Sequence, residues 1–151
     1  MKNLVVIVVS MSMVLISSFS NIAMGNEDEQ RKLNLKAFSN EVDLLSLYTE
    51  TTSLFLSIGK DTVGCYMLGG LSVRLEDLKK KSAELELSQE IQENINQTDS
   101  LIGVSSQPFN YCFNSGLQNP DSRTLACQTI DGATVFLKKI YGLLKIEVDR
   151  E

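Results

Sequence analysis

The sequence predicts an all-α fold: a small bundle of about four helices, with one long disulfide-pinned loop before the last helix. Three observations lead to this prediction. Apolar residues recur at alternating spacings of three and four, the pattern of an amphipathic helix. No stretch shows the sustained period of two that is typical of a half-buried strand. One segment, residues 103–121, accumulates Gly, Ser, Asn and Pro, as loops do.

The first 25 residues have the layout of a secretory signal peptide. Lys2 supplies a short positive region, residues 4–16 are almost wholly apolar, and Ala23-Met24-Gly25 places small residues at the −3 and −1 positions of a cleavage site. The apolar stretch is shorter than the roughly 20 residues of a membrane span. We therefore expect cleavage after Gly25 and an exported protein, periplasmic or secreted, in which residues 26–151 form a single helical domain.

The first helix is expected to begin at Arg31, after a polar and frayed leader, and to end at Gly59. Its predicted core stripe is Leu35, Phe38, Val42, Leu45, Thr49, Thr52 and Leu56, and we expect Leu44, Leu47, Tyr48 and Phe55 to widen that stripe. The second helix should be capped by Asp61 or Thr62. Its stripe is Gly64, Leu68, Leu71, Leu75, Leu78, Ser82 and Leu85. The glycines at 64, 69 and 70 indicate close packing on one face.

A third helix is expected from Ser88, with Ile91, Ile95 and Ile102 as its thin apolar stripe. The alternative is a kinked continuation of the second helix. Asp121 or Ser122 should cap the last helix. Its stripe is Ala126, Ile130, Ala133, Leu137, Ile140, Leu144 and Val148.

Three cysteines, Cys65, Cys112 and Cys127, remain after the signal peptide. In an oxidising compartment, one disulfide and one free thiol is the simplest arrangement. An up-down-up-down bundle would bring all three to one end, because Cys65 and Cys127 lie near the starts of the second and last helices. We favour Cys112–Cys127, with Cys65–Cys112 and Cys65–Cys127 as open alternatives.

The loop is the best candidate for a binding site. Phe109, Tyr111 and Phe113 are three aromatic residues within five positions, next to Cys112. Aromatic side chains on a preorganised loop are typical of interface hot spots. The structural alternative is that they cover the end of the core.

The chain contains no histidine, which removes the usual nucleophile pairs, histidine zinc ligands and the commonest general base. The adjacent carboxylates Glu76-Asp77 and Glu84-Leu85-Glu86 lie in a charge-rich helix end and are expected to be a solvated surface. We expect no enzyme activity, no metal site and no cofactor.

After removal of residues 1–25, 13 basic residues face 19 acidic ones, a net charge of −6. That charge opposes binding to nucleic acid and to anionic membranes and is compatible with a protein partner. The sequence therefore predicts a non-catalytic protein-binding module, such as an inhibitor, an immunity-type protein or an assembly factor, without a stable membrane anchor. A homodimer is possible. The alternative function is a helical carrier of a small apolar ligand.

Overall fold

The computed structural model describes residues 27–103 and 120–150, and all described segments except short turns are helical. The chain divides into two compact units, Met1–Gln30 and Arg31–Glu151. Only Glu27 to Gln30 of the first unit are described, and they are helical. The second unit contains the bundle. The four described helices are α2 (Glu27–Ser57), α3 (Asp61–Glu84), α4 (Gln89–Ile102) and α6 (Pro120–Arg150).

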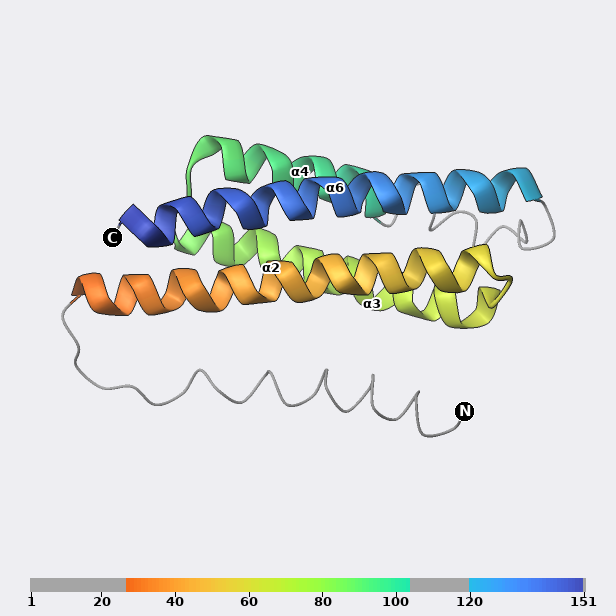
Figure 1. Ribbon diagram of the computed structural model, residues 1–151, viewed down its shortest axis with the longest axis horizontal. Coiled ribbons are helices and arrows are strands. Elements are labelled where there is room, and N and C mark those ends of the chain that lie inside the picture. The colour runs from red at the N-terminus through yellow and green to blue at the C-terminus, as the bar shows by residue number, and fades with distance from the viewer. Residues whose placement is uncertain (1–26, 104–119, 151) are drawn as a thin grey trace, which may run out of the picture. The chain divides into compact units, whose positions relative to one another are not determined.

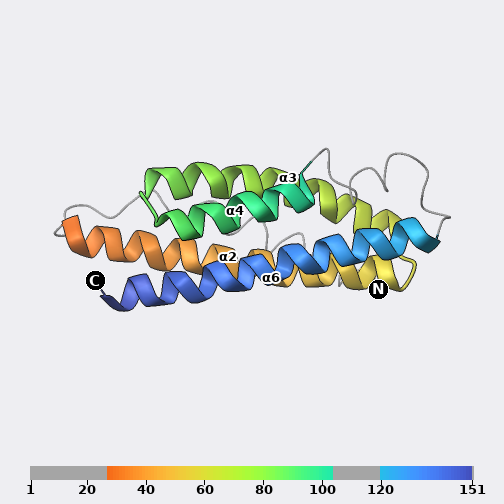
Figure 2. The same cartoon turned by 90° about the horizontal axis from the view of Figure 1, so that it is seen from above.

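The helices of the second unit run up, down, up and down, so each is antiparallel to the next (Figure 1). The two views agree that α2 lies beside α3 and α6, while α4 lies beside α3 and α6 (Figures 1 and 2). Ion pairs join these neighbours at Lys81–Glu41 (2.8 Å), Lys79–Asp99 (2.7 Å) and Lys138–Glu50 (2.5 Å). The predicted all-α, four-helix architecture is confirmed.

The core follows the predicted stripes closely. Every residue predicted to form the core stripe of the first helix is buried, including the two threonines. The same holds for Ile91, Ile95 and Ile102 of α4, and for the α6 stripe as far as Leu144. Val148, the last predicted residue of the α6 stripe, is half-buried against the core. Helical spacing alone therefore located nearly the whole core.

The helix ends are partly as predicted. Gly59 terminates α2 in the left-handed region (φ 73°), and α3 and α4 are separate helices joined through Glu86 (φ 51°). Three starts differ from the prediction. The N-cap of α3 is Lys60, so Asp61 and Thr62, the predicted caps, already lie inside the helix, and no side chain caps its start. The segment predicted to be a frayed leader is helical from Glu27, because three acidic residues in the first turn suit the positive end of the helix dipole. Pro120 is the first residue of α6, a position where proline's missing N–H costs nothing.

Two glycines of α3 allow it to approach α2 closely. A Cβ at Gly64 would lie 2.5 Å from Leu56 Cδ2, and a Cβ at Gly70 would lie 3.1 Å from Tyr48 Oη. A Cβ at Gly69 would meet no atom within 4 Å. The predicted close packing is confirmed for Gly64 and Gly70, whereas Gly69 takes no part in it.

The interface between α2 and α6 contains a buried polar contact. Thr134 Oγ1 donates to Thr49 Oγ1 over 2.7 Å and also lies 3.0 Å from Ile130 O. Thr49 Oγ1 in turn donates to Ser46 O over 2.6 Å. Each hydroxyl therefore has a partner, as buried polar groups require.

Candidate functional site

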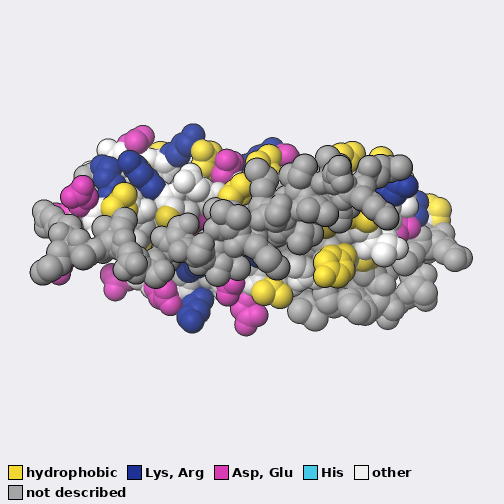
Figure 3. Space-filling view, turned by 90° about the horizontal axis from the view of Figure 1, so that it is seen from below, with side chains coloured by type: hydrophobic (Ala, Val, Ile, Leu, Met, Phe, Trp, Pro, Cys, Tyr) yellow, Lys and Arg dark blue, Asp and Glu magenta, His cyan; other side chains and the backbone are white. Residues whose placement is uncertain are grey.

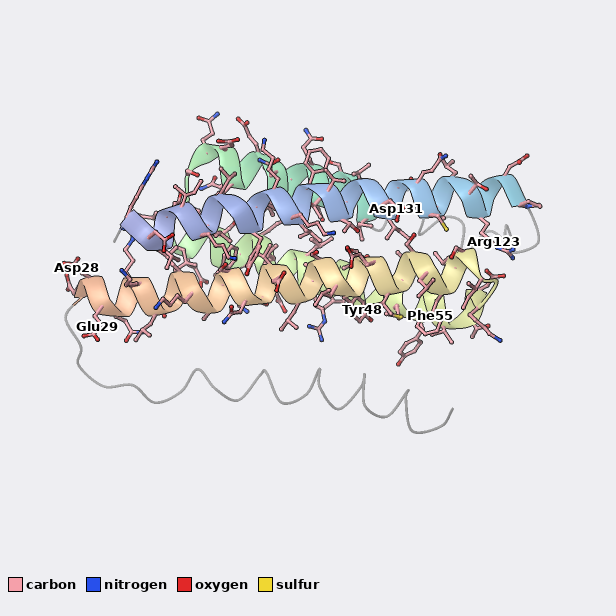
Figure 4. The ribbon with its side chains drawn as sticks, in the orientation of Figure 1. Asp28, Glu29, Tyr48, Phe55, Arg123 and Asp131 are labelled. Atoms are coloured by element: carbon pink, nitrogen blue, oxygen red, sulfur yellow. The ribbon has the colours of Figure 1, made fainter. Side chains whose placement is uncertain are left out.

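The starts of α3 and α6 meet at one end of the bundle, which we call the cysteine end. Arg123 Nη2 lies 2.8 Å from Asp61 Oδ2, and both side chains are largely shielded from solvent. Arg123 is seen at this end, near the turn between α2 and α3 (Figure 4). Cys65 and Cys127 both pack against the core from these two helices. The structure thus brings the two described cysteines to the same end of the bundle.

Cys127 carries a free thiol, so the favoured Cys112–Cys127 disulfide is not supported. The thiol donates to Ser53 O over 3.8 Å. Burial raises the pKa of the Cys127 thiol above its ordinary value, despite the opposing effect of that hydrogen bond. The prediction was wrong, because the Cys127 thiol contacts a backbone carbonyl of α2 and is not bonded to another sulfur. Cys65 is not free.

The residues predicted to bind a partner, Phe109, Tyr111 and Phe113, lie outside the described residues, as does Cys112. The structure does describe both attachment points of this segment. Ile102 ends α4 and Pro120 begins α6. The loop prediction therefore stays a prediction.

Three other aromatic residues lie near the cysteine end, and we call them the aromatic edge: Tyr48 and Phe55 on α2, and Tyr66 on α3. Tyr48 and Phe55 extend from the side of α2 that borders α3 (Figure 4). Tyr66 is 84% exposed, the highest value among the exposed large hydrophobic residues described. It also lies near enough to Tyr48 to affect that residue's titration.

Tyr48 of α2 lies against two residues of α3. The Arg74 guanidinium lies over its ring, 5.7 Å from the centroid, and Gly70 leaves room for its hydroxyl. Burial raises the pKa of Tyr48, and Arg74 opposes that shift. Tyr48 is thus the half-buried member of the aromatic edge, and Tyr66 beside it is the exposed member.

A second exposed apolar surface follows the length of α2, and we call it the outer stripe. It consists of Leu44, Leu47, Thr51, Leu54 and Ile58, spaced by three and four residues. The four aliphatic members are 43% to 58% exposed. Figure 3 views the bundle from below, and separate hydrophobic side chains are visible there between the grey residues. Exposed apolar surfaces of this kind are typical of interaction sites.

The sequence prediction for Leu44 and Leu47 was wrong, because both were expected to widen the core stripe. Each residue of the outer stripe follows a core residue by two positions, as Leu47 follows Leu45. Residues two positions apart lie about 200° apart around a helix, and therefore on nearly opposite sides. The sequence therefore contained a signal for a helix that is apolar on two opposite faces: a second apolar stripe, offset by two residues from the core stripe.

The charged residues near the end of α3 lie at the surface of the bundle. Glu76, Asp77, Glu84 and Glu86 are exposed, as predicted for a solvated surface. Lys79 and Lys81 instead link α3 to α4 and to α2. Among residues 27–103 and 120–150, no three or more Cys, Asp or Glu side chains are grouped as metal ligands.

Two open surface clefts lie between helices of the described bundle. One, of about 430 Å³, lies between α2 and α6 and is lined by Lys36, Ser39, Tyr141, Lys145 and their neighbours. The other, of about 480 Å³, lies where α4 meets α6 and is lined by polar residues such as Glu93 and Lys139. Neither is lined by the aliphatic core, so neither favours a carrier of an apolar ligand.

Within the described part of the chain, no helix combines the length and the apolar character needed to cross a bilayer.

Comparison with known proteins gives no relative: no family model, no curated protein and no solved structure matches this chain.

Proposed function

We propose that this chain is an exported, non-catalytic module that binds another protein at the cysteine end of its helical bundle. The observation that carries the proposal is the aromatic edge, with Tyr66 exposed beside the anchored Tyr48. Tyrosine supplies a large contact area at low conformational cost, which makes it common at interface hot spots. An exposed tyrosine next to a rigid one is a preorganised anchor.

The predicted aromatic loop extends the same surface. We propose a Cys65–Cys112 disulfide, because Cys127 is a free thiol and Cys65 is not free. Cys65 directly precedes Tyr66, so this bridge would bring Phe109, Tyr111 and Phe113 close to the aromatic edge. The loop and the edge would then act as one aromatic surface.

Export and lack of catalysis are parts of the same proposal. The signal-like residues 1–25 support export, and a disulfide needs an oxidising compartment. The raised pKa of the Cys127 thiol keeps it in its weakly nucleophilic form at neutral pH. The excess of acidic residues favours a partner protein over nucleic acid.

Site-specific photo-crosslinking tests the proposal. A benzophenone amino acid replaces Tyr66, and the purified protein is mixed with exported proteins from its own source. The matched control carries the same group at Val135, a solvent-exposed position on α6. We expect one discrete protein adduct from position 66 and none from position 135. The same adducts from both positions, or none from either, contradict the proposal.

A further inference from the structure

We propose that the outer stripe is an interface between two copies of this chain, in which α2 packs antiparallel to α2 of the second copy with Thr51 at the centre. The proposal is independent of the proposed function, because it rests on the outer stripe and not on Tyr66 of α3. Its occupant is a second copy of the same helix.

The spacing of the stripe suits a helix as the occupant. Positions 44, 47, 51, 54 and 58 form a seam of alternating three- and four-residue steps, the pattern by which one helix packs along another. Ile58 lies in the turn that follows α2, and its N–H bonds to Leu54 O over 3.1 Å, so the seam extends to the end of the helix. The residues on the opposite face of α2 already form such a seam inside the bundle.

The stripe is symmetric about its middle residue. Leu44 and Ile58 each lie seven residues from Thr51, while Leu47 and Leu54 lie four and three residues from it. In an antiparallel pair, Leu44 of one copy therefore meets Ile58 of the other, and Leu47 meets Leu54. A twofold interface needs this self-complementarity, because the same patch serves both copies.

Charges at the two ends of the stripe favour the antiparallel direction. Asp43 directly precedes its first residue, and Lys60 follows its last. Glu41, also before the stripe, is already paired with Lys81 of its own chain. Antiparallel pairing places the acidic end of each copy near the basic end of the other, whereas parallel pairing would place acid against acid. Asp43 has no ion pair within the described residues, so it is available for such a contact. At the centre, Glu50 is already neutralised by Lys138 of its own chain.

Sedimentation velocity of the purified protein tests whether the dimer exists. We expect a dimer at micromolar concentration. Leu47→Ser combined with Leu54→Ser should raise the dimer dissociation constant by at least about a hundredfold, because four buried leucines are lost per dimer. The matched control, Val135→Ser with Ile146→Ser, alters two comparably exposed residues of α6 and should leave the dimer intact.

Cysteine crosslinking tests the direction and the register, in a Cys127→Ala background that removes the native free thiol. Thr51→Cys should form a covalent dimer on oxidation, because residue 51 meets its own copy at the twofold axis. Leu44→Cys should not, because its two copies would be separated by about 21 Å along the helix axis.

Three results would overturn the proposal. The first is a protein that stays monomeric at every concentration. This outcome includes a monomer that uses Leu47 and Leu54 to bind neutral lipid vesicles or a different protein. The second is a dimer that survives the paired serine substitutions. The third is a dimer in which Leu44→Cys crosslinks as readily as Thr51→Cys, which would indicate parallel pairing.

Discussion

Arg123 in the first turns of α6 is bonded to Asp61, the first residue of α3, with 2.8 Å between Nη2 and Oδ2. The two residues are 62 positions apart in sequence. Their contact ties together the two helix starts that also bear Cys127 and Cys65. The ion pair therefore helps to fix the end of the bundle at which the proposed binding surface lies.

Arg123→Ala should lower the free energy of unfolding by about 1 kcal/mol, because it removes a partly buried ion pair and leaves Asp61 without this charge partner. Urea denaturation measures the change. Lys138→Ala is the matched control, since the Lys138–Glu50 pair is far more exposed and should contribute less than about 0.5 kcal/mol. Equal losses in the two variants would show that the Arg123 contact has no special structural role.

The buried threonine pair should behave as a coupled unit. Thr134→Val removes the hydrogen bond to Thr49 and should cost about 1 kcal/mol of unfolding free energy. Thr49→Val should cost a similar amount. The double variant should cost less than the sum, because neither hydroxyl is then left without its partner. A double-mutant cycle from urea denaturation gives the coupling, and strictly additive losses would argue against it.

Two glycines of the same helix should respond in opposite directions to alanine. Gly64→Ala places a methyl group against the buried Leu56 side chain and should destabilise the protein by about 1–3 kcal/mol. Gly69→Ala meets nothing within 4 Å and should stabilise it by up to about 1 kcal/mol, as alanine favours a helix. Thermal denaturation of both variants checks this. A stabilising Gly64→Ala would mean that α2 and α3 pack less closely than described.

Much of the fold was predictable, because a single apolar spacing accounts for nearly all of the buried face of each helix. Residues such as Leu35, Leu71 and Leu137 follow that spacing and are fully buried. The outer stripe was not recognised, because spacing alone does not say which of two stripes on α2 faces the core. The aromatic edge could not be predicted from the sequence, for a different reason. Tyr48 and Tyr66 come together only when α2 and α3 pair.

Thiol chemistry should report the state of the three cysteines. In denaturant without reductant, we expect one reactive thiol per chain, and peptide mapping should place it at Cys127. In the native protein, alkylation of Cys127 should be slow at neutral pH and should accelerate as the pH rises, because burial raises the pKa of its thiol. Three reactive thiols after gentle purification would contradict the proposed Cys65–Cys112 disulfide.

The same thiol should contribute to the pH dependence of stability. Since its pKa is raised in the folded state, its contribution is fully present below the unfolded-state pKa and is lost as the pH rises through the folded-state pKa. The free energy of unfolding should therefore fall in the alkaline range. In Cys127→Ala this fall should be smaller, and an identical fall in both proteins would assign it to other groups.

The most direct test of the proposed function is the affinity of Tyr66→Ser for the protein partner that crosslinking identifies. Tyr66 is so exposed that its loss should change the unfolding free energy by no more than about 0.5 kcal/mol. We predict that the dissociation constant rises at least about tenfold, as expected for an interface anchor, while Val135→Ser leaves it unchanged. Wild-type affinity in Tyr66→Ser would show that the aromatic edge is not the binding surface.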